Sequence, residues 1–368
     1  MKEKIKCCIC GKELTEETSH VFDGDVYCED CLEAHTCVCD HCSSRVRRYD
    51  VVRDEENVVC TWCYDDYYTR CEGCGRIILN EDAEYFDEDD QYPYCHECAE
   101  EFENRPIKDY HYKPNVKFYG EGPLYYGIEL EIDKGGEVDE NAYEIMQVGN
   151  SDEDRIYCKH DGSINNGFEI VSHAATAEYH LTKFPWREIL DKARKLGYCS
   201  HNTSTCGLHI HASRSALGEN YERQEETIGR IVHFVELHWN EILKFTRRTE
   251  DNINRWAARY GISTKAKDTY KNAKDRCLGR YVAVNLVNCE TIEFRMFRGT
   301  LLYSTFAATI QLVDEICSMA VRFTDKEVED MSWSDFVLKI PTEKKELIDY
   351  LKSKRLYVNE LNAESEEI

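Results

Sequence analysis

Four short segments in the C-terminal two-thirds of the chain alternate apolar residues with charged or imidazole side chains. Because successive side chains of a β-strand point to opposite faces, each segment predicts a strand with one apolar and one polar face. The segments are 126–132 (YGIELEI), 167–171 (GFEIV), 208–211 (LHIH) and 291–297 (TIEFRMF). Their polar faces carry Glu129, Glu131, Glu169, His209, His211, Glu293 and Arg295. A fifth strand is expected over residues 281–286, with Asn285 on its polar side.

Helical periodicity marks the elements that could cover the apolar faces of these strands. Residues 220–245 carry apolar side chains at the three- and four-residue spacing of an amphipathic helix, and 186–196 and 304–323 are two further candidates. A sheet with one helix-covered face and one polar face accounts for both patterns. We therefore predict an α+β fold built on an antiparallel sheet.

The N-terminal third has a different pattern, which is set by cysteine. Fourteen of the 20 cysteines lie in the first 98 residues, and twelve of them form C-x2-C pairs that repeat with a period of 32 residues. Two such pairs bring four thiolates to one tetrahedral zinc ion, whose binding supplies on the order of 10 kcal/mol of folding free energy. The sequence thus predicts three structural zinc sites that resemble LIM-type or treble-clef zinc ribbons. Their ligands are Cys7, Cys10, Cys28 and Cys31; Cys39, Cys42, Cys60 and Cys63; and Cys71, Cys74, Cys95 and Cys98.

The distribution of charge and of proline divides the chain into further parts. The net charge is −25, of which residues 1–105 carry −17 from 28 acidic and 11 basic side chains. This acidity argues against a nucleic-acid partner, and the chain has no apolar run long enough to span a membrane. The first residues lack the apolar stretch of a secretory signal, so we expect a cytoplasmic protein whose clustered cysteines bind metal. The expected parts are zinc modules over 1–105, a proline-marked linker over 106–119, a catalytic domain over 120–325, and a helical segment with an acidic tail over 326–368.

The polar side chains of the predicted sheet suit metal and phosphate chemistry. Carboxylates prefer the hard cations magnesium and manganese, and guanidinium groups such as Arg295 and Arg298 match phosphate and carboxylate oxygens. The sequence contains neither G-x-x-x-x-G-K-[ST] nor G-x-G-x-x-G, which excludes the common phosphate loops. These residues predict a nucleoside triphosphate site that relies on metal ions and arginines.

Four ordered motifs carry a family resemblance. The segments YYGIELEI, DGSINNGFEIVS, CGLHIHAS and RYVAVNL followed by TIEFRMFRGT resemble those of the amidoligases, a family related to glutamine synthetase and glutamate–cysteine ligase. The resemblance covers about residues 120–325. It implies a glutamine synthetase-like carboxylate–amine ligase, in which a concave sheet face holds ATP and divalent cations. A substrate carboxylate would attack ATP to give an acyl phosphate, and an amine would then displace phosphate to form an amide.

The resemblance also implies roles for individual side chains. The residues implied for one ion are Glu129, His209 and Glu293, and those for a second ion are Glu131 and Glu169, with Asp161 nearby. The residues implied for phosphate groups or the acyl phosphate are Arg295 and Arg298. Weaker candidates for nucleotide or substrate contacts are Arg280, Asn285, His211, Arg247 and Arg248.

Other interpretations of the same residues stay open. A metal-dependent hydrolase could use His209, His211 and Glu131 around zinc. A non-catalytic adaptor could use the zinc modules alone, and a cysteine nucleophile could pair Cys206 with His209. In the ligase interpretation the zinc modules would dock a protein or peptide substrate, and their acidity suggests a basic partner.

Overall fold

The computed structural model describes residues 4–85, 92–201, 203, 205–275 and 279–357. The chain divides into two compact units, Met1–Asn104 and Arg105–Ile368. The expected acidic tail, which ends in NAESEEI, lies outside the described residues. No helix in the described part of the chain is long and apolar enough to cross a membrane.

The N-terminal unit consists of three modules with little apolar interior. Its described strands form the hairpins β1 (His20–Phe22) with β2 (Asp25–Tyr27), β3 (Thr36–Val38) with β4 (Arg45–Arg47), β5 (Val51–Arg53) with β6 (Val58–Cys60), and β7 (Tyr68–Arg70) with β8 (Ile77–Leu79). Its helices are α1 (Glu29–His35), α2 (Thr61–Tyr67) and α3 (His96–Asn104), with 3-10 turns η1 (Glu16–Thr18) and η2 (Asn80–Asp82). Each helix begins directly after the third cysteine of a module. A small buried cluster contains Val59 and Ile77 besides three cysteines.

The C-terminal unit is organised around a mixed sheet, which has nine strands among the residues that the structure describes. The main path runs β16-β17-β15-β11-β13-β12-β9, and β14 joins β10 to β11. The strands are β9 (Ile107–Lys108), β10 (Phe118–Tyr119), β11 (Tyr126–Ile132), β12 (Ile156–Lys159), β13 (Phe168–Ser172), β14 (Ala174–Ala175), β15 (Gly207–Ser213), β16 (Val284–Asn285) and β17 (Thr291–Arg298). From β16 to β12 neighbouring strands are antiparallel, as expected. The expectation of a wholly antiparallel sheet was wrong, because β9 and β10 add parallel pairs with β12 and β14.

The helices of the C-terminal unit follow the predicted periodicity, with one difference. They are α4 (Asp139–Gly149), α5 (Ala177–Thr182), α6 (Trp186–Lys195), α7 (Tyr221–Leu237), α8 (Trp239–Thr246), α9 (Glu250–Trp256), α10 (Ala266–Asp275), α11 (Tyr303–Arg322), α12 (Asp325–Glu329), α13 (Trp333–Leu338) and α14 (Lys345–Ser353), with the 3-10 turn η3 (Arg214–Leu217). The single helix expected over 220–245 is two helices, α7 and α8, which meet at His238. The Nε2 atom of His238 lies 3.1 Å from the carbonyl oxygen of Met331, a contact that residue spacing could not show.

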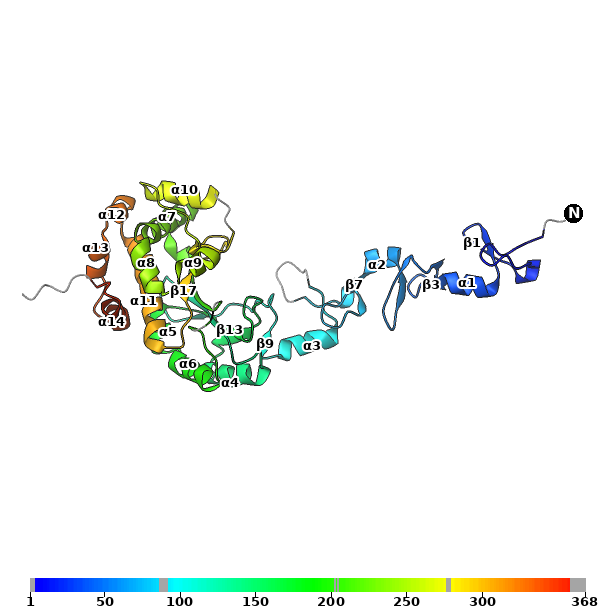
Figure 1. The fold of residues 1–368 in the computed structure, drawn as a ribbon, viewed down its shortest axis with the longest axis horizontal. Helices are drawn as coiled ribbons and strands as arrows, with labels where there is room; N and C mark the ends of the chain where they lie inside the picture. The colour runs from blue at the N-terminus through cyan, green and yellow to red at the C-terminus, as the bar shows by residue number, and fades with distance from the viewer. Residues whose placement is uncertain (1–3, 86–91, 202, 204, 276–278, 358–368) are drawn as a thin grey trace, which may run out of the picture. The chain divides into compact units, whose positions relative to one another are not determined.

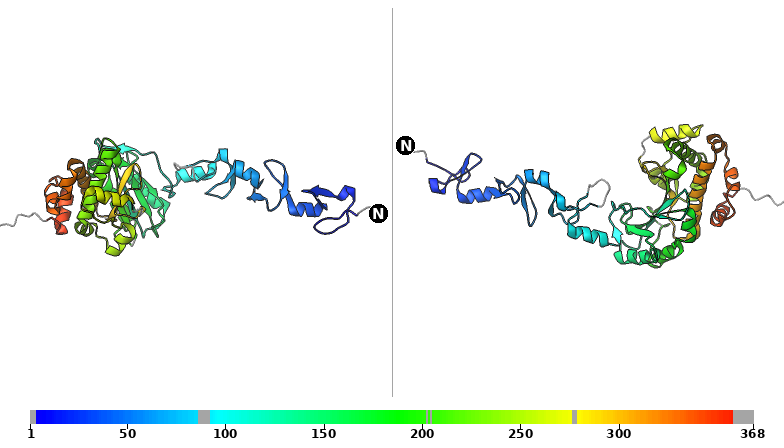
Figure 2. Two further views of the ribbon diagram at one scale, coloured as in Figure 1. Left: turned by 90° about the horizontal axis from the view of Figure 1, so that it is seen from above. Right: turned by 180° about the vertical axis from the view of Figure 1, so that it is seen from behind.

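The apolar faces of the central strands pack against helices to form one continuous core. Ile128, Leu130, Ile210 and Phe294 are fully buried in it, together with Trp186 of α6. Helices α12 to α14 lie along α7 and α11, on the side of these helices that faces away from the sheet (Figures 1 and 2). The core therefore occupies one face of the sheet and leaves the polar side chains on the other.

Candidate functional site

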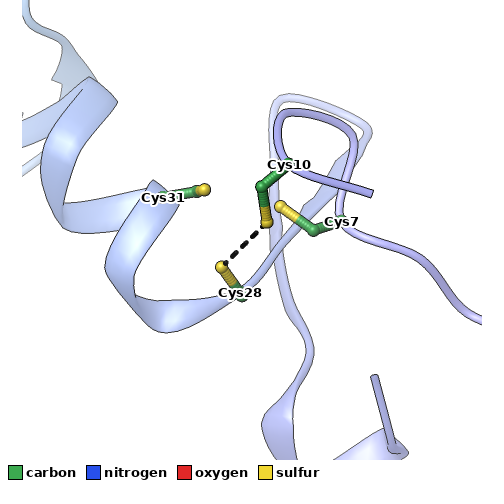
Figure 3. Close-up of side chains that lie close together, drawn as sticks. All are labelled: Cys7, Cys10, Cys28 and Cys31. Atoms are coloured by element: carbon green, nitrogen blue, oxygen red, sulfur yellow. Dashed lines mark hydrogen bonds between the residues drawn. The ribbon is translucent and has the colours of Figure 1, made fainter. Parts of the chain in front are cut away.

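Each module of the N-terminal unit gathers its four predicted cysteines. Within each set, the four sulfur atoms lie within 4.8 Å of one another. In the first module, Cys7 and Cys10 come from a turn and Cys28 and Cys31 from the start of α1 (Figure 3). Tetrahedral zinc with bonds of about 2.3 Å requires sulfur–sulfur separations of about 3.8 Å. The separation is 3.7 Å between Cys10 and Cys28. It is 4.0 Å and 3.8 Å for the equivalent pairs of the other modules. The described residues thus form three clusters with the geometry of zinc sites.

Cross-strand register brings the predicted polar side chains of the C-terminal unit together. Directly opposite residues on neighbouring strands are close neighbours on one face of a sheet. Three such pairs lie on adjacent strands, and they are Glu131 with Glu169, Glu129 with His209, and His211 with Glu293. Side chains that are up to 164 residues apart in the sequence therefore form one cluster, which we call the carboxylate–imidazole cluster.

The distances within this cluster are short and its members are buried. The Nδ1 atom of His209 lies 3.4 Å from Glu129 Oε2 and 3.5 Å from Glu293 Oε1, while its Nε2 atom lies 3.8 Å from Glu131 Oε1. Glu131, His209 and Glu293 expose 4% or less of their surface. The Glu129 side chain is 27% exposed. His209 is thus surrounded by carboxylates in a poorly hydrated place.

Several donor atoms in the cluster are close enough to share a metal ion. Glu129, Glu169 and His209 form such a set, and so do Glu129, His211 and Glu293. The implied pairs, His209 with Glu293 and Glu131 with Glu169, are also neighbours in the cluster. Strand register adds His211 to the candidate ligands, because it lies directly opposite Glu293.

Electrostatics inside the cluster favour an added cation. Burial raises the pKa of Glu169 well above its usual range, and the charges of Glu129 and Glu131 raise it further. Burial likewise raises the pKa of Glu131, although His209 partly offsets the effect. Burial alone would also raise the pKa of Glu129, but the imidazoles of His211 and His209 bring it well below its usual value. His211 has a pKa of about 9, because the attraction of Glu129 outweighs burial. The cluster thus holds more acid than its imidazoles balance.

A β-bulge decides where Arg298 lies. Between Ile210 and Leu208 the register shifts by one residue, so that Phe297 pairs with Leu208 and Arg298 with Gly207. In a regular strand, Arg298 would share the apolar face of Ile292 and Phe294. The bulge instead places Phe297 in the core and Arg298 on the polar side.

Four members of the cluster, Glu129, Glu131, Glu169 and His209, line a cavity of about 230 Å³. Of the predicted residues, those that line it are Glu129, Glu131, Asp161, Glu169, His209, Arg248, Arg280 and Arg295. Arg280, at the rim, donates hydrogen bonds to the hydroxyl groups of Tyr110 and Tyr281 at 2.7 and 3.2 Å. Arg295 makes a short ion pair with Glu293, yet its buried Nε atom has no hydrogen-bond partner.

The predicted residues that do not line this cavity are His211 and Glu293, which belong to the cluster, and Asn285, Arg247 and Arg298. Asn285 donates to Glu293 at 2.8 Å and accepts a hydrogen bond from the Val287 N–H, so both ends of its amide are engaged by the protein. Asn285 thus orients the Glu293 carboxylate through this hydrogen bond. Arg298 lines a smaller, neighbouring cavity with Arg247 and Arg248.

Sequence reasoning missed or undervalued several residues of the cavity. Lys159 lies opposite Glu169 on β12 and lines the cavity, although only a short alternating stretch, IYCK, could have indicated it. Arg248 lines both cavities, and it follows α8 in a segment without periodicity. Cys206 is buried, and burial raises the pKa of its thiol to about 12, which makes it a poor nucleophile.

Comparison with known proteins gives little further guidance. No family model matches the sequence, and no curated protein matches it. Among solved structures, the chain is similar to a bifunctional glutathione synthetase from Pasteurella multocida, with a TM-score of 0.37 and 10% sequence identity. The similarity covers 63% of this chain and 46% of the synthetase, which is less than half of that enzyme. A TM-score this low does not establish a shared fold.

Proposed function

We propose that the C-terminal unit is an ATP-dependent carboxylate–amine ligase that requires a divalent cation. One observation carries the proposal: carboxylates and imidazoles from four adjacent strands form one cluster, and its members Glu129, Glu131, Glu169 and His209 line a cavity together with Arg295. The four motifs that resemble the amidoligases are the segments that contribute these side chains. A small or peptide-borne carboxylate and an amine are the proposed substrates, with the zinc modules as a docking platform for a protein or peptide.

The residues present fit magnesium or manganese. The donor atoms are carboxylate oxygens with one imidazole per set, which is an acceptable shell for these cations. The buried Nε2 atom of His211 lies 3.1 Å from Glu129 Oε1, an ion pair that does not have the geometry of a hydrogen bond. A bound cation would keep Glu169 ionised and would polarise phosphoryl oxygens. The residues proposed to hold it are Glu129, Glu169, His209, His211 and Glu293.

The remaining side chains supply charge and proton transfer. Arg295 and Lys159 line the cavity and would stabilise negative charge as the γ-phosphoryl group passes from ATP to the substrate carboxylate. The amine nitrogen then attacks the acyl carbon, phosphate leaves, and the amine loses a proton. Glu131 is suited to accept that proton, because burial raises the pKa of this carboxyl above its usual value and it lines the same cavity.

Release of ADP and phosphate tests the proposal. Full-length, zinc-loaded protein with ATP, Mg²⁺ and a panel of carboxylates and amines should form amide and ADP in equal amounts. Glu129→Gln and Arg295→Gln should each lower kcat by about 10³-fold, the typical cost of losing a transition-state electrostatic contact. The exposed α7 pair Glu222→Gln and Arg223→Gln serves as the control and should change little. Full turnover in both site variants, or amide cleavage without ATP, would overturn the proposal.

A further inference from the structure

A second cavity adjoins the first and is lined by arginines. Its volume is about 70 Å³, and Arg247, Arg248 and Arg298 line it together with Asn252 and Cys206. Helices α8 and α9 both contact β17 (Figure 1), and Arg247 and Arg248 lie in the loop between these two helices. We call it the arginine cavity. Three guanidinium groups around a small space form an anion-attracting environment.

The arginines of this cavity are poorly satisfied by the protein. The Nε atoms of Arg247 and Arg248 are buried and have no hydrogen-bond partner. Their Nη2 atoms donate to backbone carbonyl oxygens, Arg247 to Arg298 at 3.3 Å and Arg248 to Phe297 at 3.1 Å. Buried donors without partners carry a substantial desolvation cost, which a bound oxyanion would remove.

Mutual repulsion adds to this cost. Burial lowers the pKa of Arg247, and the charge of Arg298 lowers it further. Burial also lowers the pKa of Arg248, where the attraction of Glu131 is opposed by Arg295 and Arg298. An anion among these groups would relieve the repulsion.

The backbone at Arg247 gives independent evidence. Arg247 follows the last residue of α8 with φ = +62°, in the left-handed region that glycine occupies most easily. A non-glycine residue there costs about 1 kcal/mol. An arginine side chain is thus held over the cavity at a backbone position where its presence is strained, as is typical of binding sites.

The arginine cavity shares a lining residue with the carboxylate-lined cavity, because Arg248 lines both of them. Gly207 lies beside this arginine, and a Cβ added to it would fall 2.6 Å from Arg248 Nη2 and 2.6 Å from His209 Nε2. The missing side chain lets the arginine lie beside the carboxylate–imidazole cluster, so one ligand could reach both places.

We propose that the arginine cavity is a second oxyanion subsite, which takes one terminal carboxylate or phosphate group of a substrate whose reacting end lies in the carboxylate-lined cavity. Anion binding at this subsite stands on the arginine geometry alone. The statement about the substrate rests on the proposed ligase function, and it means that at least one substrate carries a second anionic group. The arginine cavity, with a volume of about 70 Å³, is large enough for one carboxylate or phosphate group but not for a triphosphate.

Anion binding without nucleotide tests the subsite. Full-length, zinc-loaded protein is titrated calorimetrically with inorganic phosphate and, separately, with malonate, at constant ionic strength held by chloride. At least one of the two anions should bind saturably, and the stronger one identifies phosphate or carboxylate as the preferred group. Arg247→Gly should weaken binding by about tenfold or more, the loss of roughly one charge-assisted hydrogen bond.

The matched control separates binding from backbone effects. Arg355 also has positive φ, at +54°, and is exposed at the end of α14. Arg355→Gly removes the same charge and relieves the same kind of strain, and should leave anion affinity unchanged. Arg247→Gly should not lower the Tm of the free protein, because it removes strain. No saturable binding to the wild type, or equal affinities in the Arg247→Gly and Arg355→Gly variants, would overturn the subsite.

Turnover distinguishes the subsite from the ligase function. Arg247→Gly should raise the KM for an anionic substrate by about tenfold. The KM for a neutral analogue of that substrate should not change. Absence of turnover, with anion binding that still depends on Arg247, would reject the ligase function and keep the subsite. Turnover with anion binding independent of Arg247 would reject the subsite alone.

Discussion

The two units of the chain obtain their stability from different sources. In the N-terminal unit, cysteines make up most of the small cluster around Val59 and Ile77. The C-terminal unit buries a continuous apolar core on one face of a sheet, including Trp186 and Phe294. The first unit therefore depends on metal coordination and the second on packing. The clusters of the two units also differ, because each thiolate cluster offers the four ligands of a structural zinc site, whereas four residues of the carboxylate–imidazole cluster line a cavity.

Removing zinc should have the largest effect and should act on one unit. A strong chelator should unfold residues 4–104, since each structural site contributes on the order of 10 kcal/mol, while the C-terminal unit keeps its protected core. Hydrogen exchange followed by mass spectrometry measures both regions in one sample. Added zinc should restore protection. Unchanged protection of the N-terminal amides in chelator would contradict the comparison.

Truncation of a core side chain should destabilise the C-terminal unit and leave the zinc modules intact. Phe294→Ala removes a fully buried ring from β17 and should lower the free energy of unfolding of the C-terminal unit by about 3–5 kcal/mol. The zinc content should stay at three ions. Phe118, which is 62% exposed, provides the matched control, and Phe118→Ala should cost far less. Denaturant titration with metal analysis checks both variants.

A buried histidine should make the C-terminal unit sensitive to acid. His180 donates from Nε2 to the Tyr126 carbonyl at 2.9 Å and accepts from the Trp186 indole at Nδ1, so a second proton has no acceptor. Burial lowers the pKa of His180 from 6.5 to about 4. The unfolded chain binds this proton more readily, so stability should be complete above pH 6.5 and fall by about 3 kcal/mol as the pH approaches 4.

His180→Gln isolates this contribution from the many carboxylates that titrate in the same range. The stability difference between wild type and variant should shrink as the pH falls from 6.5 to 4. A difference that does not depend on pH in this window would show that His180 is not held neutral.

Removing one acid from the carboxylate–imidazole cluster should have the smallest effect on stability. Unlike the changes above, it should stabilise the C-terminal unit. Glu169→Gln removes a buried acid whose ionisation is disfavoured by burial and by Glu129 and Glu131. In metal-free protein at neutral pH it should stabilise the C-terminal unit by about 1 kcal/mol. It should also weaken Mn²⁺ binding. Destabilisation by this substitution would mean that the carboxylate serves packing and not a cation.

Local alternation made the polar faces of the sheet predictable, whereas long-range register did not. Glu129, Glu131, His209 and His211 could be placed on strand faces because side chains alternate along a strand. Which imidazole lies opposite Glu293 depends on the pairing of β15 with β17, for which one sequence carries no signal. The bulge that moves Arg298 is likewise a property of two strands together.

Segments without periodicity were the hardest to anticipate. Residues 106–119 look like a linker, yet they contribute β9 and β10 through pairing with distant strands. Arg247 and Arg248 follow α8 in a loop, and only the fold shows that β17 lies beside them. By contrast, the cysteine clusters were predictable in full, because each pair of ligands is local and the zinc geometry is fixed.

Binding of Mn²⁺ to zinc-loaded, full-length protein tests the central claim, that side chains of four strands hold a divalent cation, most directly. Calorimetric titration without nucleotide should show saturable binding beyond the three zinc ions. The affinity should fall by about tenfold or more in Glu129→Gln and in Glu293→Gln, and should not change in the exposed control Glu222→Gln. Equal affinity in all four proteins, or no saturable binding to the wild type, would contradict the account.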